Sequence, residues 1–397
     1  MNFYDEISSQ RSARVVDFTA TGESVCNLLI VGCGMIGREH MRVATLLGRA
    51  RVHGIYDTEP VSISEAVRDF ASYSPQKLVV YSDLKSAADD PAIDAIFICT
   101  PNFSHFEVLQ KVKHTTKPLF IEKPMATRLD DAKAMVQIAK EYPTFIQLGM
   151  QYRFKSQYVD AFHEIRKKKS LGAIKTIAMS EYRPPFLTKV RQWNKFNEFS
   201  GGTLVEKCCH YFDLINLMAG SRIESVYALS GQAVNFIGFS YEGKESDIHD
   251  HAFVVMQFAG GIRASFTLNM FSQELYEELI VTGEQGRLLA AEHSSFSSGI
   301  RSRANVMVEV EGHSAYEGTE VTYPASIETS GHHGATFFEH EAFVDQFENK
   351  PHDSASCEQG LWAILAATAA QESAATGRVI LVKDFAAEHG LNDVLSW

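Results

Sequence analysis

The amino-acid sequence predicts an α/β protein with two domains, a helix-covered parallel sheet followed by a large, mostly antiparallel sheet. Two observations lead to this prediction. From Val25 to about residue 150, apolar runs of strand length alternate with helical stretches, which is typical of parallel strands buried on both faces. After that point strand-like segments dominate, and glycine-containing turns join neighbours closely enough for hairpins.

In the first region, hydrophobic periodicity predicts an alternation of strands and helices. The expected strands are 25–31, 52–56, 77–81, 95–99, 119–121 and 145–148, and the expected helices are 36–47, 62–70, 106–112 and 130–140.

In the second region, a helix at 158–168 and a strand at 173–183 precede a continuous helix from Thr203 to Met218. The helix 357–376 is expected to end at Gly377, because glycine commonly terminates helices. The other expected strands are 223–234, 251–258, 261–269, 278–281, 287–291, 306–310 and 321–323, with a further helix at 337–347. The predicted organisation is an N-terminal extension (1–24), a first domain (25–148), a second domain (149–380) and a C-terminal tail (381–397).

Composition excludes several classes of function. The chain of 397 residues carries a formal net charge of −12, whereas binding to nucleic-acid phosphates needs a basic surface. No uninterrupted apolar run of about 18 residues is present, so we expect no membrane span. The N-terminus lacks the apolar segment of a secretory signal, and the six cysteines are scattered without a C-x-x-C pair. Reduced thiols and a cytoplasmic location are therefore expected.

The first motif lies at 28–37, where a strand runs into G-x-G-x-x-G and then a helix. In such a motif, the glycines permit a tight turn, close approach of a pyrophosphate and close packing of helix on strand. Asp57 closes the second strand, where a carboxylate hydrogen-bonds the adenosine ribose and repels a 2′-phosphate, so NAD is preferred over NADP. The alternative is a glycine-rich turn in a fold that binds no nucleotide, with Asp57 solvated. The predicted cofactor contacts in this motif are Gly32, Gly34, Met35, Ile36, Gly37 and Asp57.

Two further motifs follow later strands, and a third opens the helix that begins near Thr203. They read T-P-N-x-x-H at 100–105, E-K-P at 122–124, and G-G-x-x-x-[acid]-x-x-x-H-x-x-D at 201–213. Together with the glycine motif, this ordered set resembles the Gfo/Idh/MocA oxidoreductases, which include inositol dehydrogenases and glucose–fructose oxidoreductase. The resemblance covers about residues 25–380. It implies a Rossmann dinucleotide-binding domain followed by a C-terminal α+β domain with a large open sheet.

The resemblance assigns Lys123 to a position beside the nicotinamide and the reacting hydroxyl. An ammonium there would stabilise the alkoxide that develops as hydride leaves the carbinol carbon. From its residues alone, Lys123 reads as a surface lysine in a turn between a strand and a helix. The further cofactor contacts that the motifs imply are Thr100, Pro101, Asn102, His105, Glu122 and Lys123.

On a continuous helix, Glu206, His210 and Asp213 would share one face, because their spacings are four and three. The adjacent Cys208 and Cys209 would point elsewhere, so neither a metal site nor a thiol nucleophile is expected. The resemblance implies that His210 is the general base and that Glu206 orients substrate hydroxyls. Relatives usually carry Asp where this chain has Glu206, so the substrate is not copied from any relative.

Weaker signals come from the second region. Arg153 either contacts a polyol or carboxylate or forms a structural ion pair, and Trp193 either stacks on a sugar face or fills core. His249 and His251 flank an aspartate without a third ligand nearby, and they receive no role.

The leading functional hypothesis is an NAD-dependent dehydrogenase that acts on a secondary hydroxyl of a sugar, cyclic polyol or sugar derivative. The catalytic set is Lys123, His210 and Glu206, and the substrate contacts add Arg153 and Trp193. The alternatives are a redox-neutral, NAD-retaining glycosidase and a non-catalytic dinucleotide sensor. The resemblance also implies a homo-oligomer, a dimer or tetramer, that assembles through the C-terminal sheet.

Overall fold

The computed structural model of the chain describes residues 26–295, 303–314 and 318–396. The predicted extension 1–24 lies outside them. The described residues divide into two compact units, and each is built from separate stretches of the chain. The first unit holds the residues up to Ala126, Ala134–Lys155 and Tyr323–Cys357, and the second holds the remainder. The domain boundaries expected from the sequence stay a prediction, and the units of the structure are distributed differently along the chain.

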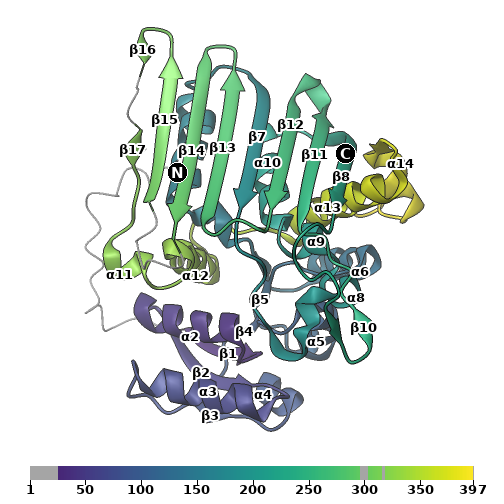
Figure 1. Cartoon of the computed structure of the whole chain (residues 1–397). Helices are drawn as coiled ribbons and strands as arrows, with labels where there is room; N and C mark the ends of the chain where they lie inside the picture. The colour runs from purple at the N-terminus through teal and green to yellow at the C-terminus, as the bar shows by residue number, and fades with distance from the viewer. Residues whose placement is uncertain (1–25, 296–302, 315–317, 397) are drawn as a thin grey trace. The chain divides into compact units, whose positions relative to one another are not determined.

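The first unit contains a six-stranded parallel sheet in the order β3-β2-β1-β4-β5-β6 (Figure 1). This order places the first strand at the centre, as in a Rossmann fold, and confirms the predicted class. The strands are β1 (Cys26–Val31), β2 (Ala50–Tyr56), β3 (Val79–Val80), β4 (Ala95–Ile98), β5 (Leu119–Glu122) and β6 (Ile146–Gly149).

Local signals set the ends of the helices of this unit. The short helix α4 (Leu84–Asp89), which periodicity did not predict, begins where the Asp83 carboxylate accepts the N–H of Ser86 at 2.7 Å. Helix α2 ends at Gly48, which has a φ of 72°. Helix α2 spans Met35–Leu47. The other helices are α3 (Pro60–Ala71), α5 (His105–Val112) and α12 (Ala335–Phe347), while α6 (Leu129–Glu141) spans the boundary between the units.

The second unit is built on a ten-stranded sheet in which β7 and β12 are parallel and every other described pairing is antiparallel. A separate hairpin joins β9 (Ser240–Tyr241) and β10 (Lys244–Glu245). The strands of the large sheet are β7 (Ile174–Tyr182), β8 (Ile223–Gly231), β11 (His251–Phe258), β12 (Arg263–Asn269), β13 (Leu275–Gly283), β14 (Gly286–Ser294), β15 (Arg303–Val310), β16 (His313–Ser314), β17 (Thr319–Glu320) and β18 (Ile380–Leu381).

One predicted strand is wrong. The segment 321–323 lies after β17 and is not in a strand. The N–H of Val321 bonds Ala304 O on β15 at 2.9 Å. Its apolar residues Val321 and Tyr323 are buried outside the ladder, and Pro324 then starts the short helix α11 (Ala325–Glu328). The apolar run therefore reflects burial in core and not strand pairing.

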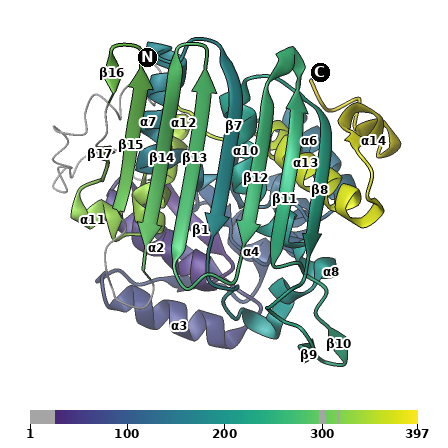
Figure 2. The same ribbon diagram turned by 45° about the horizontal axis from the view of Figure 1, so that its top comes forward.

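Helices cover one face of the large sheet, while its other face shows strands alone (Figure 2). The alternation along β11 agrees with this, because Val254 and Met256 are buried while Phe253 and Val255 are exposed. The helices of this unit are α7 (Ser156–Phe162), α8 (Asn197–Ser200), α9 (Thr203–Glu206), α10 (Cys209–Ala219), α13 (Cys357–Thr376) and α14 (Val382–Glu388). None of the helices in the described part of the chain is long and apolar enough to cross a membrane.

The predicted continuous helix from Thr203 to Met218 is wrong in one respect. Helix α9 ends at Glu206, residues 207 and 208 form a turn, and α10 begins at Cys209. The N–H of Cys208 bonds Thr203 O at 3.4 Å, five residues back, and the N–H of Tyr211 bonds Cys208 O at 2.9 Å, three residues back. The bonds from Lys207 N–H to Thr203 O and from Phe212 N–H to Cys208 O keep the four-residue spacing, so the irregularity is confined to the turn. The angular argument for one continuous helix does not hold across that turn.

Candidate active site

The glycine motif forms a tight loop between β1 and α2. Gly32 has a φ of 97°, and a Cβ there would lie 2.7 Å from the backbone of Cys99 and Thr100. A Cβ on Gly37 would lie 1.9 Å from Gly32 O. Gly34 differs, because no atom lies within 4 Å of the position of its Cβ. Packing within the chain therefore explains two glycines, while the space at Gly34 fits the close approach of a dinucleotide phosphate.

Asp57 is fixed beside this loop. Its carboxylate accepts the N–H of Cys33 at 2.6 Å and the N–H of Glu59 at 2.8 Å. The guanidinium of Arg38, one residue after the motif, is paired with Glu65 at 2.8 Å. The glycine loop thus carries a fixed carboxylate, and its nearest arginine in the sequence is already neutralised.

His105 joins the T-P-N and E-K-P motifs. One ring nitrogen lies 2.9 Å from Thr100 O and the other lies 2.9 Å from Pro124 O. The ring is fully buried, and burial lowers the pKa of His105 although both carbonyl oxygens favour the protonated form. The two loops that follow β4 and β5 are therefore held together from inside the unit.

Glu122 fixes the backbone of Lys123. Its carboxylate accepts the N–H of Lys123 at 2.9 Å and bonds His40 Nε2 at 2.8 Å. His40 Nδ1 lies 2.7 Å from Nε2 of His340 on α12. Burial alone would raise the pKa of Glu122, but the hydrogen bond from His40 and the charge of Lys123 hold it below its ordinary value. The sequence analysis missed His40, although its position on the buried face of α2, three residues after Gly37, was a signal.

Arg153 also belongs to the first unit, in a 3₁₀ turn (Gln151–Phe154) that follows β6. Its side chain is buried. Burial and nearby carboxylates raise the pKa of Glu339 well above its ordinary value, and the charge of Arg153 opposes this. The structure therefore places Arg153 in a buried electrostatic cluster of the first unit.

In the second unit, the double glycine before α9 allows close packing against α13. Gly201 and Gly202 have φ values of 79° and 89°, and a Cβ on Gly202 would lie 2.2 Å from Oε1 of Gln371. The amide of Gln371 in turn donates to Gly201 O at 3.1 Å. Only glycine fits both the backbone and the space, so the start of α9 is tied to α13.

Glu206, His210 and Asp213 are all buried in the second unit, on the two short helices α9 and α10. The carboxylate of Glu206 is paired with Lys189 Nζ at 3.2 Å. The same ammonium lies 4.5 Å from the centre of the Trp193 ring. The buried ring of Trp193 therefore supports Lys189, whose ammonium covers one face of that ring. Lys189 was not singled out in the sequence, because it lies in a loop without periodicity.

The Cys208 thiol next to this site is not activated as a nucleophile. Burial raises the pKa of Cys208 well above its ordinary value, and Glu181 raises it further. Within the described ranges no group of three His, Cys, Asp or Glu side chains has a geometry that could hold a metal ion.

The sequence analysis also missed a row of buried glutamates. Glu181 on β7, Glu277 on β13 and Glu292 on β14 lie directly opposite one another in the sheet register, and all are buried. The hydroxyls of Tyr158 and Tyr211 donate to Glu277 at 3.1 Å and 2.9 Å. Strand partners far apart in the sequence create this row, so only the pairing of β7, β13 and β14 shows it.

Lys207, in the turn between α9 and α10, contacts this row. Its ammonium lies 3.0 Å from the carboxylate of Glu181, and its side chain is 9% exposed. Because removing one member of a buried ion pair is costly, this contact holds the turn against β7. Glu206 and Cys209 on either side of the turn are fixed with it.

The comparisons with known proteins agree with this architecture. The model of an oxidoreductase family, NAD-binding Rossmann fold, matches residues 26–150, and that of an oxidoreductase family, C-terminal alpha/beta domain, matches residues 167–382. The uncharacterized oxidoreductase YrbE of Bacillus subtilis is 28% identical over 211 residues, which span 52% of this chain and 57% of that protein. Myo-inositol 2-dehydrogenase of Thermotoga maritima is 24% identical over 289 residues, 71% of this chain and 78% of that protein.

Among solved structures, myo-inositol dehydrogenase from Lactobacillus casei in complex with NAD(H) and myo-inositol is similar in fold. The TM-score is 0.69 at 23% identity, over 90% of this chain and 97% of that chain. Both halves of the family architecture are matched by their own models. The first three motifs follow β1, β4 and β5, and the fourth spans α9 and the start of α10. The chain belongs to the Gfo/Idh/MocA oxidoreductase family.

Proposed function

We propose that this protein is an NAD-dependent dehydrogenase that transfers hydride between the nicotinamide and a secondary hydroxyl of a sugar or cyclic polyol. The observation that carries the proposal is the position of Lys123. It follows β5 directly, in a loop whose backbone is held by Glu122 and His105. Ligands of open α/β sheets bind beyond the carboxyl ends of the strands, where this loop lies.

Each residue has a defined role in the proposed reaction. When bound, NAD supplies the acceptor for the hydride that leaves the carbinol carbon. The ammonium of Lys123 stabilises the negative charge that develops on the substrate oxygen. An imidazole nitrogen of His210 accepts the hydroxyl proton, and Glu206 accepts hydrogen bonds from substrate hydroxyls. For Arg153 we propose a structural role, because it is buried in the cluster that contains Glu339.

The proposal extends to the cofactor. The space beside Gly34 fits a pyrophosphate, and the two hydrogen bonds that fix Asp57 hold a carboxylate at the glycine loop. A fixed negative charge there repels a 2′-phosphate, so we expect NAD to bind more tightly than NADP.

We further propose a cytoplasmic homo-oligomer that assembles through the large sheet. All six cysteines are free thiols, which suits a reducing compartment. On the face of the sheet opposite the helices, Leu229 and Phe253 are paired in register and are 57% and 59% exposed. Exposed apolar side chains gathered on one sheet face are typical of an interface between subunits.

The experiment is a spectrophotometric screen for the formation of reduced nicotinamide cofactor. Purified protein with NAD or NADP is assayed against inositols, aldoses, sugar acids and amino sugars, and calorimetry measures the dissociation constants of both cofactors. Lys123→Met and His210→Ala are assayed in parallel. We expect NADH formation with one group of substrates, and a loss of about 10²-fold or more in kcat for each variant.

The outcomes separate the candidate functions. Bound NAD without net NADH, but with hydrolysis of a glycoside, would identify a redox-neutral glycosidase. NAD binding without any turnover would identify a sensor. Full activity in both variants would show that the catalytic assignment is wrong.

A further inference from the structure

Glu206 forms an ion pair with Lys189. Its carboxylate lies 3.2 Å from Lys189 Nζ, and the side chains of Glu206 and Lys189 are 4% and 31% exposed. The ammonium is therefore the more accessible member of the pair. A ligand that approaches Glu206 also meets a positive charge that is already matched by a negative one.

The segment that carries Lys189 is held in a strained shape. Arg191 and Gln192 adopt left-handed backbone conformations, with φ values of 51° and 55°. This conformation is unfavourable for a residue other than glycine, and such strain persists where surrounding structure imposes it. Two contacts close the segment on itself: Gln192 Oε1 accepts from Lys195 Nζ at 2.6 Å, and Asn194 donates to Leu187 O at 3.0 Å.

Lys195 fixes this segment to a neighbouring loop. Its side chain is buried, and its ammonium lies 5.3 Å from the ring centre of Phe236 and 4.4 Å from that of Phe239. A lysine held over two aromatic faces is an attractive contact. The Lys189 segment therefore depends on the position of the loop at 233–239.

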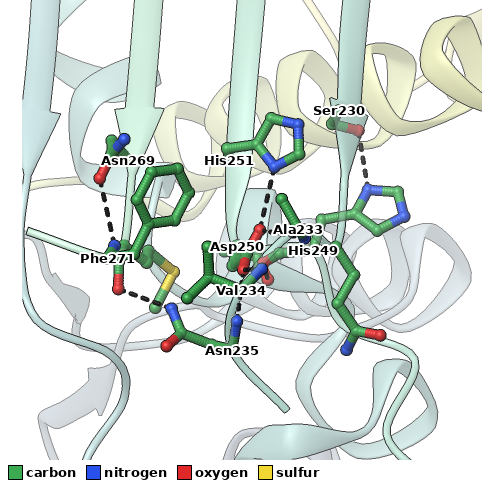
Figure 3. Close-up of polar contacts among 12 residues, drawn as sticks. Ser230, Ala233, Val234, Asn235, His249, Asp250, His251, Asn269 and Phe271 are labelled. Carbon is green, nitrogen blue, oxygen red and sulfur yellow. Dashed lines mark hydrogen bonds and ion pairs between the residues drawn. The ribbon is translucent and has the colours of Figure 1, made fainter. Parts of the chain in front are cut away.

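That loop is anchored on Asp250, as Figure 3 shows. The buried carboxylate of Asp250 accepts the N–H groups of Ala233, Val234 and Asn235 at 2.7–2.9 Å. It also bonds His251 Nδ1 at 2.9 Å. Burial would raise the pKa of Asp250, but the hydrogen bonds from His251 and from the three backbone N–H groups hold it below its ordinary value. The backbone bonds also fix the loop against β11. Asp250, which lies between His249 and His251, therefore supports the Lys189 segment through the loop at 233–239.

We propose that the Lys189–Glu206 pair selects uncharged polyhydroxylated substrates and discriminates against both sugar acids and amino sugars. This inference rests on the proposed function and names the substrate class of the same site. Its physical basis is that the charges of Lys189 and Glu206 cancel and that the Glu206 side chain is almost fully buried.

A hydroxyl group suits both members of the pair, because it can donate to the Glu206 carboxylate and accept from the Lys189 ammonium. A substrate carboxylate would instead compete with Glu206 for Lys189 and be repelled by the Glu206 carboxylate. A substrate ammonium would compete with Lys189 for Glu206 and be repelled by Lys189. Each charged class is therefore attracted by one member of the pair and repelled by the other, so both are disfavoured relative to a hydroxyl.

The test removes the charges of the pair, singly and together. The variants are Lys189→Met, Glu206→Gln and the double variant Lys189→Met/Glu206→Gln, which keeps the net charge of the pair. Lys175→Met is the matched control, since Lys175 and Glu284 form an ion pair at 2.8 Å in which both side chains are 56% exposed. The ligands are D-glucose, D-glucuronate and D-glucosamine with its amine protonated, together with myo-inositol and its amino analogue.

Two readouts are compared for every variant: kcat/KM with NAD, and the dissociation constant of each ligand in the presence of NADH. Wild type and the control should prefer the uncharged ligand of each series. Lys189→Met should shift the preference toward the amine by about 10- to 100-fold, and Glu206→Gln should shift it toward the carboxylate. The double variant should lose discrimination in both directions, even if a single variant fails to fold.

A wild-type preference for a charged ligand overturns the inference, and so do unchanged ligand ratios in the double variant. The binding readout keeps this result separate from the proposed function. Correct ranking in binding without turnover would contradict the dehydrogenase and leave the charge selection standing. Absence of binding by every ligand would contradict both.

Discussion

At the scale of single residues, Glu339 is the clearest case of a group whose charge state matters to stability. Both oxygens of its carboxyl are buried without a hydrogen-bond partner among the described residues. Burial and the carboxylates of Glu122 and Glu39 raise its pKa well above the ordinary value. The folded state therefore holds a proton that the unfolded state releases near pH 4.5.

Stability from such a group is fully present below its unfolded pKa and is lost as pH rises. Glu339→Gln removes this dependence, so it should raise the unfolding midpoint at neutral pH by roughly 2–4 °C, equivalent to about 1 kcal/mol. The gain should shrink on acidification in thermal melts across pH. Glu141→Gln, an exposed glutamate of the same unit, is the control. A lower midpoint for Glu339→Gln at neutral pH would contradict the assignment of a neutral carboxyl.

Glu39 shows the opposite behaviour. It accepts hydrogen bonds from His332 at 2.7 Å and Thr336 at 2.6 Å. Burial would raise its pKa, but His332 and Thr336 lower it from 4.5 to about 2. A lowered pKa contributes stability above the unfolded value, about 3 kcal/mol here, which is lost as pH falls from about 4.5 to 2.

Glu39→Gln should therefore weaken the protein at neutral pH and flatten its acid denaturation curve. Urea unfolding at several pH values measures both effects. A variant with the same acid sensitivity as wild type would show that another group controls acid unfolding.

At the scale of elements, the double glycine before α9 leads to a sharp prediction. Gly202 has φ 89° and ψ 162°, a region that residues with a side chain rarely adopt, and a Cβ would collide with Gln371. Gly202→Ala should destabilise the protein by about 2–4 kcal/mol. Gly377→Ala is the matched control, because Gly377 has a φ of 69° but no atom within 4 Å of its Cβ position. It should cost about 1 kcal/mol. Equal losses in denaturant unfolding would show that packing on α13 is unimportant.

Elements of the first unit could be predicted because their signals are local. Continuous apolar runs mark β1 and β4, and Gly34 of the glycine motif directly precedes α2, so the order of strands and motifs follows from the sequence. The break between α9 and α10 could not be predicted in this way. The spacing of Glu206, His210 and Asp213 fits an unbroken helix, and the turn depends on Lys207 reaching Glu181 on β7.

The residues of the candidate site also differ in whether a local sequence signal marks them. Motif residues such as Lys123 and His210 were found from their spacing and the family resemblance. Lys189 was not found, because its importance arises from a contact with Glu206, 17 residues away, across a loop without periodicity. His40 and Asp250 likewise act through residues that only the fold brings near.

At the scale of the whole molecule, the exposed face of the large sheet predicts self-association. Val255 on β11 is 51% exposed on the same face as Phe253. Val255→Asp should reduce the sedimentation coefficient to that of a smaller assembly, because a carboxylate would be buried at the interface. Val61→Asp, at a valine on α3 that is 69% exposed, should leave the assembly intact. Identical sedimentation of both variants with wild type would exclude this face.

The interleaving of the two units along the chain has a consequence for biosynthesis. The last stretch of the dinucleotide-binding unit is Tyr323–Cys357, which contains α12 with His340 and follows most of the second unit in the sequence. A nascent polypeptide that has emerged only to Lys155 therefore presents the α2 surface around His40 without its covering helix. Maturation of the unit must wait for the translation of nearly the whole second one. Any ribosome stall before α12 would expose an apolar surface to chaperones and proteases.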